Sequence, residues 1–104
     1  MKGLWAATHD QRNLKVQIVV GCIVVIAGFY FAITPVEWSI ILICIALVTA
    51  LELINTAIEN LVDLVTRERH PLAGKIKDIA AGAVLTVSVI SLIVGLIIFR
   101  KYVI

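Results

Sequence analysis

Residues 79–99 form a stretch of twenty-one residues without a charged side chain. A helix of about 20 apolar residues spans the hydrocarbon core of a bilayer, whereas a small soluble domain has too little interior to bury such a run. A second run covers residues 16–34 and is interrupted only by Gln17, and a third covers residues 38–65. The three runs predict an all-α membrane protein with three transmembrane helices.

The composition supports this prediction and limits the alternatives. Of the 104 residues, 62% are hydrophobic, and the mean hydropathy is +1.09. We therefore expect residues 1–104 to form a single membrane-embedded domain. The net charge of +2 is too small to indicate a nucleic-acid partner. Cys22 and Cys44 stand singly within apolar runs, so we expect neither a disulfide nor a metal site from them.

The basic residues are distributed unevenly around the three runs. Lys2, Arg12 and Lys15 precede the first run; Arg67, Arg69, Lys75 and Lys77 lie between the second and third; the first connection carries none. The positive-inside rule then predicts that the N-terminus and the loop 66–78 face the cytoplasm. Arg100 and Lys101, beyond the third run, are the exception.

Turn-forming residues predict where the helices begin and end. Thr-Pro-Val-Glu at 34–37 predicts a tight antiparallel connection between the first two spans. Pro71 and Gly74 predict that residues 66–77 form a loop, and Asp78 is expected to open the third helix, because a carboxylate suits a helix N-terminus. The small residues Ala-Ala-Gly-Ala at 80–83 predict that another helix approaches closely there.

Polar side chains recur along the second half of the middle run. The four that fall within about 80° of one another on a 3.6-residue helix are Glu52, Asn55, Glu59 and Asp63. Counted from residue 38, Glu52 lies about 20 Å along an apolar slab roughly 30 Å thick. Glu59 then lies at the boundary of the slab and Asp63 beyond it.

Two interpretations of this polar face remain open. In the first, the side chains only mark the end of the apolar segment, and Arg67 and Arg69 are ordinary cytoplasmic cations. In the second, they form a site for phosphoryl transfer to a lipid whose head group lies at this depth. Ionisable groups inside a membrane span indicate function, which favours the second interpretation for Glu52 and Asn55.

Phosphoryl transfer requires groups that the chain contains near this face. Mg²⁺ needs one or two carboxylates besides phosphate oxygens, and Glu59 is suitably placed. Phosphates bind lysine and helix N-terminal N–H groups, which indicates Lys77 and the start of the third helix beside Asp78. A hydroxyl nucleophile needs a base, for which Glu52 is the candidate, with Asn55 to orient it. No GxxxxGK[ST] loop or protein-kinase glycine loop is present, which argues against soluble kinase folds.

Three segments carry a resemblance to a known family: ELINTAIENLVD, HPLAGKIKDIAAGAVL and, more weakly, GLWAATHDQRNLK. Together they resemble the small integral-membrane bacterial diacylglycerol kinases and the related undecaprenol kinases. The resemblance implies an ATP- and Mg²⁺-dependent lipid kinase of the bacterial inner membrane. It also implies three transmembrane helices per subunit and a homotrimeric bundle with active sites shared between subunits.

The resemblance implies roles for individual residues as well. Glu52 is expected to be the catalytic base, Asn55 to lie in the same site, and Glu59 to hold Mg²⁺. The residues expected to contact ATP are Glu68, Arg69, His70, Lys77 and Asp78, with Asp63 in the same site. We place Asn13 and Gln17 beside the lipid substrate, together with Glu52.

The N-terminal segment departs from the family pattern. The family has a metal-binding glutamate just before an Arg-Asn-aromatic-Arg element, and the matching position here is Gln11 in QRNLK. An amide can bind Mg²⁺ through oxygen but carries no charge. Asp10 points about 100° away on a helix and substitutes only if the segment rotates. The family also usually has an amphipathic surface helix before the position of Met1.

The lipid and the function class stay open at this point. The NTAIEN and KDIAAGAVL segments are closer to the undecaprenol kinases, but the groove expected to sort the lipids is built from interchangeable Leu, Ile and Val. A catalytically weak relative that binds lipid or nucleotide as a scaffold is the second hypothesis. A proton-carrying channel or rotor subunit based on Glu52 is the third, and it leaves the other charged residues unused.

Overall fold

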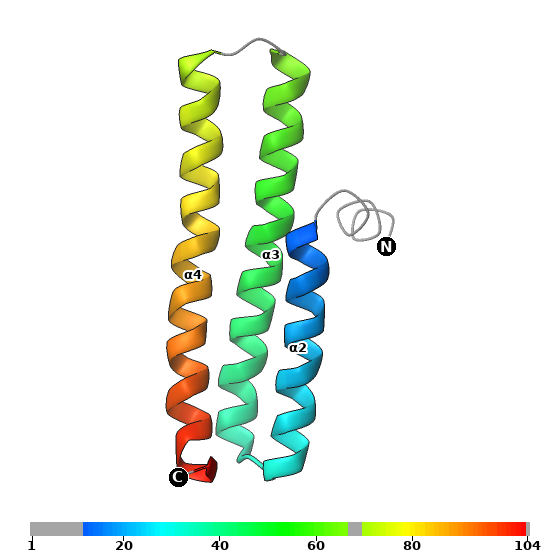
Figure 1. Cartoon of the computed structure of the whole chain (residues 1–104), viewed down its shortest axis with the longest axis vertical. Helices are drawn as coiled ribbons and strands as arrows, with labels where there is room; N and C mark the ends of the chain where they lie inside the picture. The colour runs from blue at the N-terminus through cyan, green and yellow to red at the C-terminus, as the bar shows by residue number, and fades with distance from the viewer. Residues whose placement is uncertain (1–11, 67–69, 104) are drawn as a thin grey trace.

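The computed structural model describes residues 12–66 and 70–103, and the side chains of residues 15–66 and 70–103. Within these ranges the chain forms three helices, α2 (Arg12–Phe31), α3 (Pro35–Val65) and α4 (Pro71–Val103). Figure 1 shows α3 between α2 and α4, with each helix running antiparallel to the next. The prediction of an all-α fold is confirmed.

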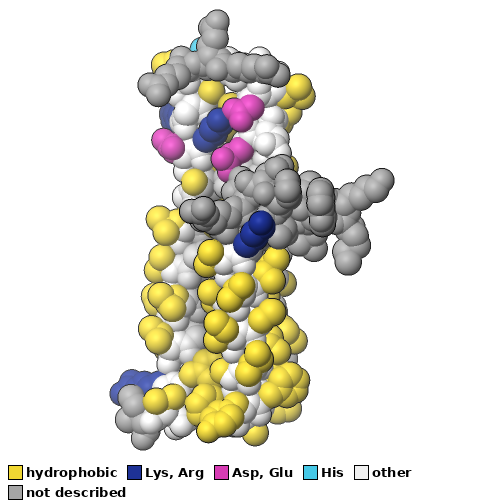
Figure 2. Space-filling model, turned by 45° about the vertical axis from the view of Figure 1, so that its right-hand side comes forward, with side chains coloured by type: hydrophobic (Ala, Val, Ile, Leu, Met, Phe, Trp, Pro, Cys, Tyr) yellow, Lys and Arg dark blue, Asp and Glu magenta, His cyan; other side chains and the backbone are white. Residues whose placement is uncertain are grey.

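Two of these helices are long and apolar enough to cross a membrane. They are α3 and α4, which contain 31 and 33 residues and so extend about 46 and 50 Å. The apolar part of α2, Lys15–Phe31, is shorter. Figure 2 shows hydrophobic side chains over most of the visible surface below the level where carboxylates gather. These features fit a membrane protein; the third membrane crossing and the trimer stay predictions.

The α2–α3 turn forms where the sequence predicts it. Thr34 is the N-cap of α3: its Oγ1 accepts a 3.2 Å hydrogen bond from the N–H of Glu37, and Glu37 Oε1 accepts one of 3.0 Å from the N–H of Thr34. Pro35 begins the helix, where no N–H is needed. Ala32 has a φ of 51°, the left-handed conformation in which the chain leaves α2. The turn therefore lies at 32–34, so α2 ends before residue 34 and α3 begins before residue 38.

The hydrophobic core lies beside this turn. Three isoleucines are buried together, one from the turn, one from α3 and one from α4: Ile33, Ile41 and Ile98. The ring of Trp38 packs 4.9 Å from that of Phe29. A Cβ at Gly28 would lie 2.7 Å from Cη2 of Trp38, so the indole reaches this position only because residue 28 has no side chain.

A buried carboxylate joins α4 to α3 at the same end. Glu37, which is 8% exposed, accepts a hydrogen bond from the hydroxyl of Tyr102 and forms a 2.7 Å ion pair with Nζ of Lys101. Lys101, one of the two cations that depart from the charge pattern, is thus paired within the chain. The last turn of α4 is held against the first turn of α3.

α4 begins eight residues before the expected start of the third span at residue 79. Pro71 is its first residue and Gly74 lies within it, so the prediction that these residues break the helix is wrong. His70 caps the helix, because its Nδ1 accepts a 3.1 Å hydrogen bond from the N–H of Leu72. Asp78 is consequently the eighth residue of α4. The predicted helix N-terminus beside Asp78 is therefore also wrong, because N–H groups so far into a helix are bonded within it.

The three helices differ in how far they extend toward the α3–α4 connection. A Cβ at Gly21 of α2 would contact Cγ2 of Ile45 of α3, which fixes the antiparallel register of this pair. Arg12 lies nine residues before Gly21, so α2 begins at about the level of Ile54, nine residues after Ile45. Beyond that level, among the helices of residues 12–66 and 70–103, only α3 and α4 continue, as Figure 1 shows.

Candidate functional site

The polar face of α3 lies where the α3–α4 pair extends past the start of α2. Glu52 is near the level at which α2 begins and is 9% exposed. Its backbone oxygen accepts a 3.0 Å hydrogen bond from Oγ1 of the buried Thr56. Its carboxylate makes no hydrogen bond or ion pair with residues 12–66 and 70–103. The residue is largely buried, but its unpartnered carboxylate oxygens keep some exposure and are available to a proton donor from outside the chain.

Asn55 and Glu59 form a hydrogen-bonded pair one helical turn apart. Nδ2 of Asn55 donates to Oε1 of Glu59 at 2.9 Å. Asn55 therefore contacts Glu59 rather than Glu52, the residue it was expected to orient. Oδ1 of Asn55 is buried and has no donor within the described part of the chain. An acceptor in that position costs free energy unless a ligand, a water molecule or a further residue donates to it.

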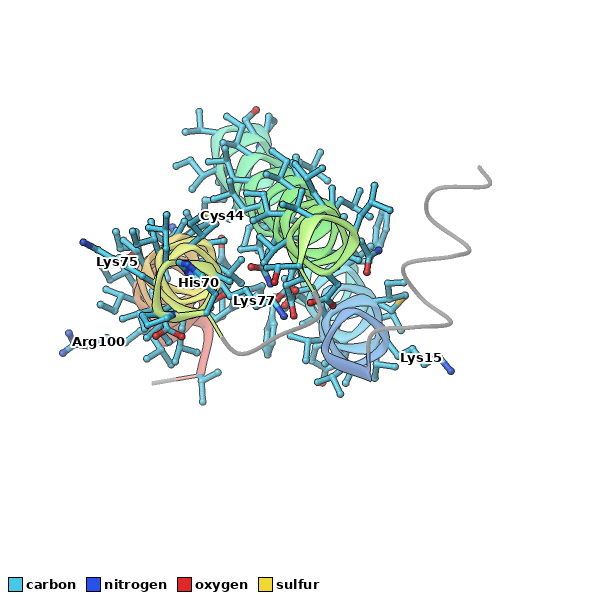
Figure 3. All side chains as sticks on the ribbon, turned by 90° about the horizontal axis from the view of Figure 1, so that it is seen from above. Lys15, Cys44, His70, Lys75, Lys77 and Arg100 are labelled. Carbon is cyan, nitrogen blue, oxygen red and sulfur yellow. The ribbon has the colours of Figure 1, made fainter. Side chains whose placement is uncertain are left out.

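Lys77 brings α4 into the same site. Its Nζ lies 2.6 Å from Oδ1 of Asp63, and the two side chains are 36% and 60% exposed. In the view along the bundle in Figure 3, Lys77 points toward oxygen atoms beside α3, whereas Lys75 points away from the bundle. A surface pair of this kind adds little stability. The ion pair matters because it holds the ammonium group of Lys77 beside Asp63, which lies about one helical turn from Glu59 on α3.

The other predicted site residues that the structure describes form no hydrogen bond or ion pair with Glu52, Asn55 or Glu59. Asp78 is exposed and makes no hydrogen bond or ion pair in the described ranges, and His70 is occupied in capping α4 through Nδ1. Gln17 of α2 is half-buried. Gln11, Glu68 and Arg69, with the side chain of Asn13, lie outside the described residues, so their predicted roles stay predictions.

The donor set fits Mg²⁺ only in combination with a phosphate ligand. No group of three His, Cys, Asp or Glu side chains that could hold a metal ion occurs among residues 12–66 and 70–103. Mg²⁺ nevertheless binds proteins through one or two carboxylates plus substrate phosphates. Glu59 offers such a carboxylate, since Asn55 donates to only one of its two oxygens.

The sequence predicted an apolar groove but not which helices would form it. An apolar groove runs along the bundle between α2 and α4, over one face of α3, and its lining includes Gln17 and Ser88. Nothing in the sequence pairs these helices across α3. The only available signal was the interruption of two apolar runs by polar side chains at these positions.

Known proteins are similar in sequence to this chain along the segment that contains all of these site residues. A family model described as prokaryotic diacylglycerol kinase matches residues 1–99. The undecaprenol kinase of Bacillus subtilis is 46% identical over 98 residues, which cover 94% of this chain and 80% of that protein. The diacylglycerol kinase of Haemophilus influenzae is 30% identical over 100 residues, covering 95% and 85%. That of Synechocystis is 37% identical over 94 residues, covering 89% of this chain and 54% of the relative.

Proposed function

Because the chain belongs to the prokaryotic diacylglycerol kinase family, a family of lipid kinases, we propose that it transfers the γ-phosphoryl group of ATP to a lipid primary hydroxyl. Undecaprenol is the favoured acceptor over diacylglycerol, because the undecaprenol kinase of Bacillus subtilis is 46% identical and the Haemophilus influenzae diacylglycerol kinase is 30% identical. The observation that carries the proposal is the unpartnered carboxylate of the largely buried Glu52 beside the Asn55–Glu59 pair.

Glu52 is the proposed catalytic base. Its carboxylate takes the proton of the lipid hydroxyl as that oxygen attacks the γ-phosphorus of ATP. The new bond joins the lipid oxygen to phosphorus, and the bond from phosphorus to the β–γ bridging oxygen breaks. ADP leaves with the electron pair of that bond. The depth of Glu52 suits this role, since a lipid hydroxyl reaches the apolar boundary and the γ-phosphate of ATP can meet it there from the cytoplasmic side.

Asn55 holds the reacting groups in position. Its amide nitrogen is fixed by Glu59, which directs Oδ1 to the other side of the amide group. The free Oδ1 accepts a hydrogen bond from a water molecule beside the lipid hydroxyl, whose own single proton goes to Glu52. We therefore assign Asn55 to positioning of the acceptor as well as of Glu59, in place of the predicted contact with Glu52.

Glu59 and Lys77 form the proposed phosphate end of the site. Bound Mg²⁺ would neutralise charge on the transferring phosphoryl group, with Glu59 as its protein ligand and Gln11 as the second. The ion pair between Lys77 and Asp63 is exposed and weak. Lys77 can therefore leave Asp63 and bind a phosphate oxygen of ATP instead. His70, Asp78, Glu68 and Arg69 complete the proposed ATP contacts.

The proposed assembly is a homotrimer in the bacterial inner membrane, with active sites shared between subunits and the N-terminus and the 66–78 segment in the cytoplasm. Glu59 and Asp63 lie where only α3 and α4 are described, and two helices cannot enclose a polar site alone. At Gly82, in the Ala-Ala-Gly-Ala segment of α4, an added Cβ meets nothing within 4 Å. That open, small-residue surface supports the close approach of a second copy.

The test is a lipid-acceptor assay with purified protein in vesicles, ATP labelled at the γ-phosphate, and Mg²⁺. Labelled phosphate is expected on undecaprenol and, more slowly, on diacylglycerol. Glu52→Gln should reduce transfer by roughly 10²–10⁴-fold. Asn60→Gln, at an exposed position of the same helix, is the matched control. Absence of transfer to both lipids, or an unchanged rate for Glu52→Gln, overturns the proposal.

A membrane scaffold that binds lipid or nucleotide without efficient turnover is the second candidate. Gln11 is the observation that favours it, because an amide does not offset the charge of a divalent cation. In that case the same assay detects binding of nucleotide or lipid but little transfer.

A further inference from the structure

The apolar groove between α2 and α4 runs along the bundle toward Glu52. It has a volume of about 380 Å³ and uses α3 as its floor. Val48 lines its upper part and lies one helical turn below Glu52 on the same face of α3. Phe99 and Ile41 line the opposite end, beside the hydrophobic core. A molecule lying in the groove therefore has one end near Glu52.

The groove is polar at one end and apolar at the other. Gln17 and Ser88 line the part nearest Glu52, and Ser91 follows one turn further along α4. Beyond Ser91 the lining consists of aliphatic and aromatic side chains, glycine and the thiol of Cys44. This gradient matches an amphiphile with a hydroxyl at one end of a hydrocarbon chain.

Two glycines give the groove its width. Gly21 of α2 and Gly95 of α4 both line it. At Gly95 an added Cβ would meet nothing within 4 Å, and at Gly21 it would only contact Ile45 at 4.0 Å. Neither glycine is required by packing of the described chain, so the space that each leaves is available to an occupant. The expectation of a groove of Leu, Ile and Val alone therefore needs correction.

We propose that this groove binds the hydrocarbon chain of the lipid acceptor, and that Gly21 and Gly95 make it wide enough for the methyl-branched chain of a prenol. The proposal rests on the function proposed above. One groove takes one chain, and a prenol is a single chain that ends in a primary hydroxyl. Diacylglycerol carries two chains, of which the groove holds only one. The groove thus favours single-chain prenols, of which it takes the isoprene units nearest the hydroxyl while the rest of the chain lies in the bilayer.

Kinetics of a groove-filling variant test the proposal. Gly95→Leu adds a side chain where the fold has open space, and should raise KM for undecaprenol about tenfold with little change in kcat. Phosphorylation of the short prenol geraniol should change much less, because its chain ends before Gly95. Ile97→Phe, an exposed site outside the groove on the same helix, is the control. Equal losses with both alcohols, or no loss with undecaprenol, overturn the proposal.

The two native cysteines provide a test that does not depend on turnover. Cys44 lines the groove, whereas Cys22 is exposed and does not line it. In a Cys22→Ser protein, undecaprenol should slow modification of Cys44 by a membrane-permeant maleimide several-fold. In a Cys44→Ser protein it should leave modification of Cys22 unchanged. This comparison stays informative if the protein transfers no phosphate, so failure of the groove and failure of the kinase function are distinguishable.

A second copy of the chain is the competing occupant. If a helix of a neighbouring subunit fills the groove, Cys44 is protected without added lipid, and its protection follows protein concentration in the membrane. That result, or equal protection of both cysteines by undecaprenol, overturns the lipid assignment.

Discussion

The hydroxyl of Tyr102 donates a 2.5 Å hydrogen bond to Oε1 of Glu37, joining residues 65 positions apart in the sequence. The same carboxylate accepts from the N–H of Thr34 and pairs with Lys101. One side chain therefore caps α3 and anchors the end of α4.

Glu37→Gln is expected to lower the melting temperature of the detergent-solubilised protein. The amide keeps an acceptor for the N-cap but loses the ion pair with Lys101. Circular dichroism during heating is the measurement. Tyr102→Phe should be milder, and the double variant should be less destabilised than the sum of the two. Additive effects would contradict coupling between Glu37 and Tyr102.

Gly28→Ala is expected to destabilise the α2–α3 turn by about 1–3 kcal/mol, the usual cost of overpacking. The added Cβ would lie 2.7 Å from the indole of Trp38, whose ring is held in contact with Phe29. Denaturant unfolding in detergent measures the effect. Gly95→Ala is the matched control, because its Cβ meets nothing within 4 Å. Equal stability of the two variants would contradict the close packing of Trp38.

Asn55→Asp is expected to reduce kcat by roughly 10²-fold, in the range lost when one positioned donor is removed. The new carboxylate cannot donate to Glu59 and repels it instead. Steady-state phosphorylation of undecaprenol measures the change. The same substitution at Asn60, which is exposed on α3, should have little effect. A similar loss for both variants would show that added charge, rather than the Asn55–Glu59 contact, is responsible.

Lys77→Met is expected to raise KM for ATP about tenfold, with a smaller effect on KM for the lipid, because a charge-assisted contact to phosphate is lost. Lys75→Met is the control, since Lys75 points away from the bundle in Figure 3. ATP titrations at saturating lipid measure both. A larger effect on the lipid than on ATP would place Lys77 outside the nucleotide contact.

Gln11→Glu is expected to lower the Mg²⁺ concentration needed for half-maximal activity, because a second carboxylate offsets more of the cation's charge. A large accompanying gain in kcat would identify the natural chain as a weak enzyme and support the scaffold hypothesis. Unchanged Mg²⁺ dependence would instead show that Gln11 is not a metal ligand. Asp10→Asn is the control, because it should change the Mg²⁺ dependence only if the segment is rotated so that Asp10 replaces Gln11 as the metal ligand.

The sequence predicted the parts of the fold that depend on local chemistry. Three apolar runs predicted the helices, and the Thr-Pro-Val-Glu segment at 34–37 predicted the first turn, whereas the capping box of Thr34 and Glu37 was not predicted. The start of α4 was predicted wrongly because Pro71 was interpreted as a breaker. Proline is equally compatible with the first position of a helix, and only the cap from His70 distinguishes the two cases.

The candidate site was predictable where its members share one helix. Glu52, Asn55 and Glu59 lie on one face because their spacing requires it. The partner of each side chain was not predictable, since it depends on the rotamer and on what α4 contributes. The contact of Lys77 with Asp63 crosses fourteen residues, and its geometry follows from the register of α3 against α4.

The change along α3 from an apolar groove to a polar face bears on how the product leaves. The acceptor arrives as an uncharged alcohol, whereas the phosphorylated product carries about two negative charges. Returning those charges to an apolar groove is strongly unfavourable. The phosphorylated head group is therefore expected to move toward Glu59 and Asp63 and into water, while the lipid chain leaves the groove sideways into the bilayer.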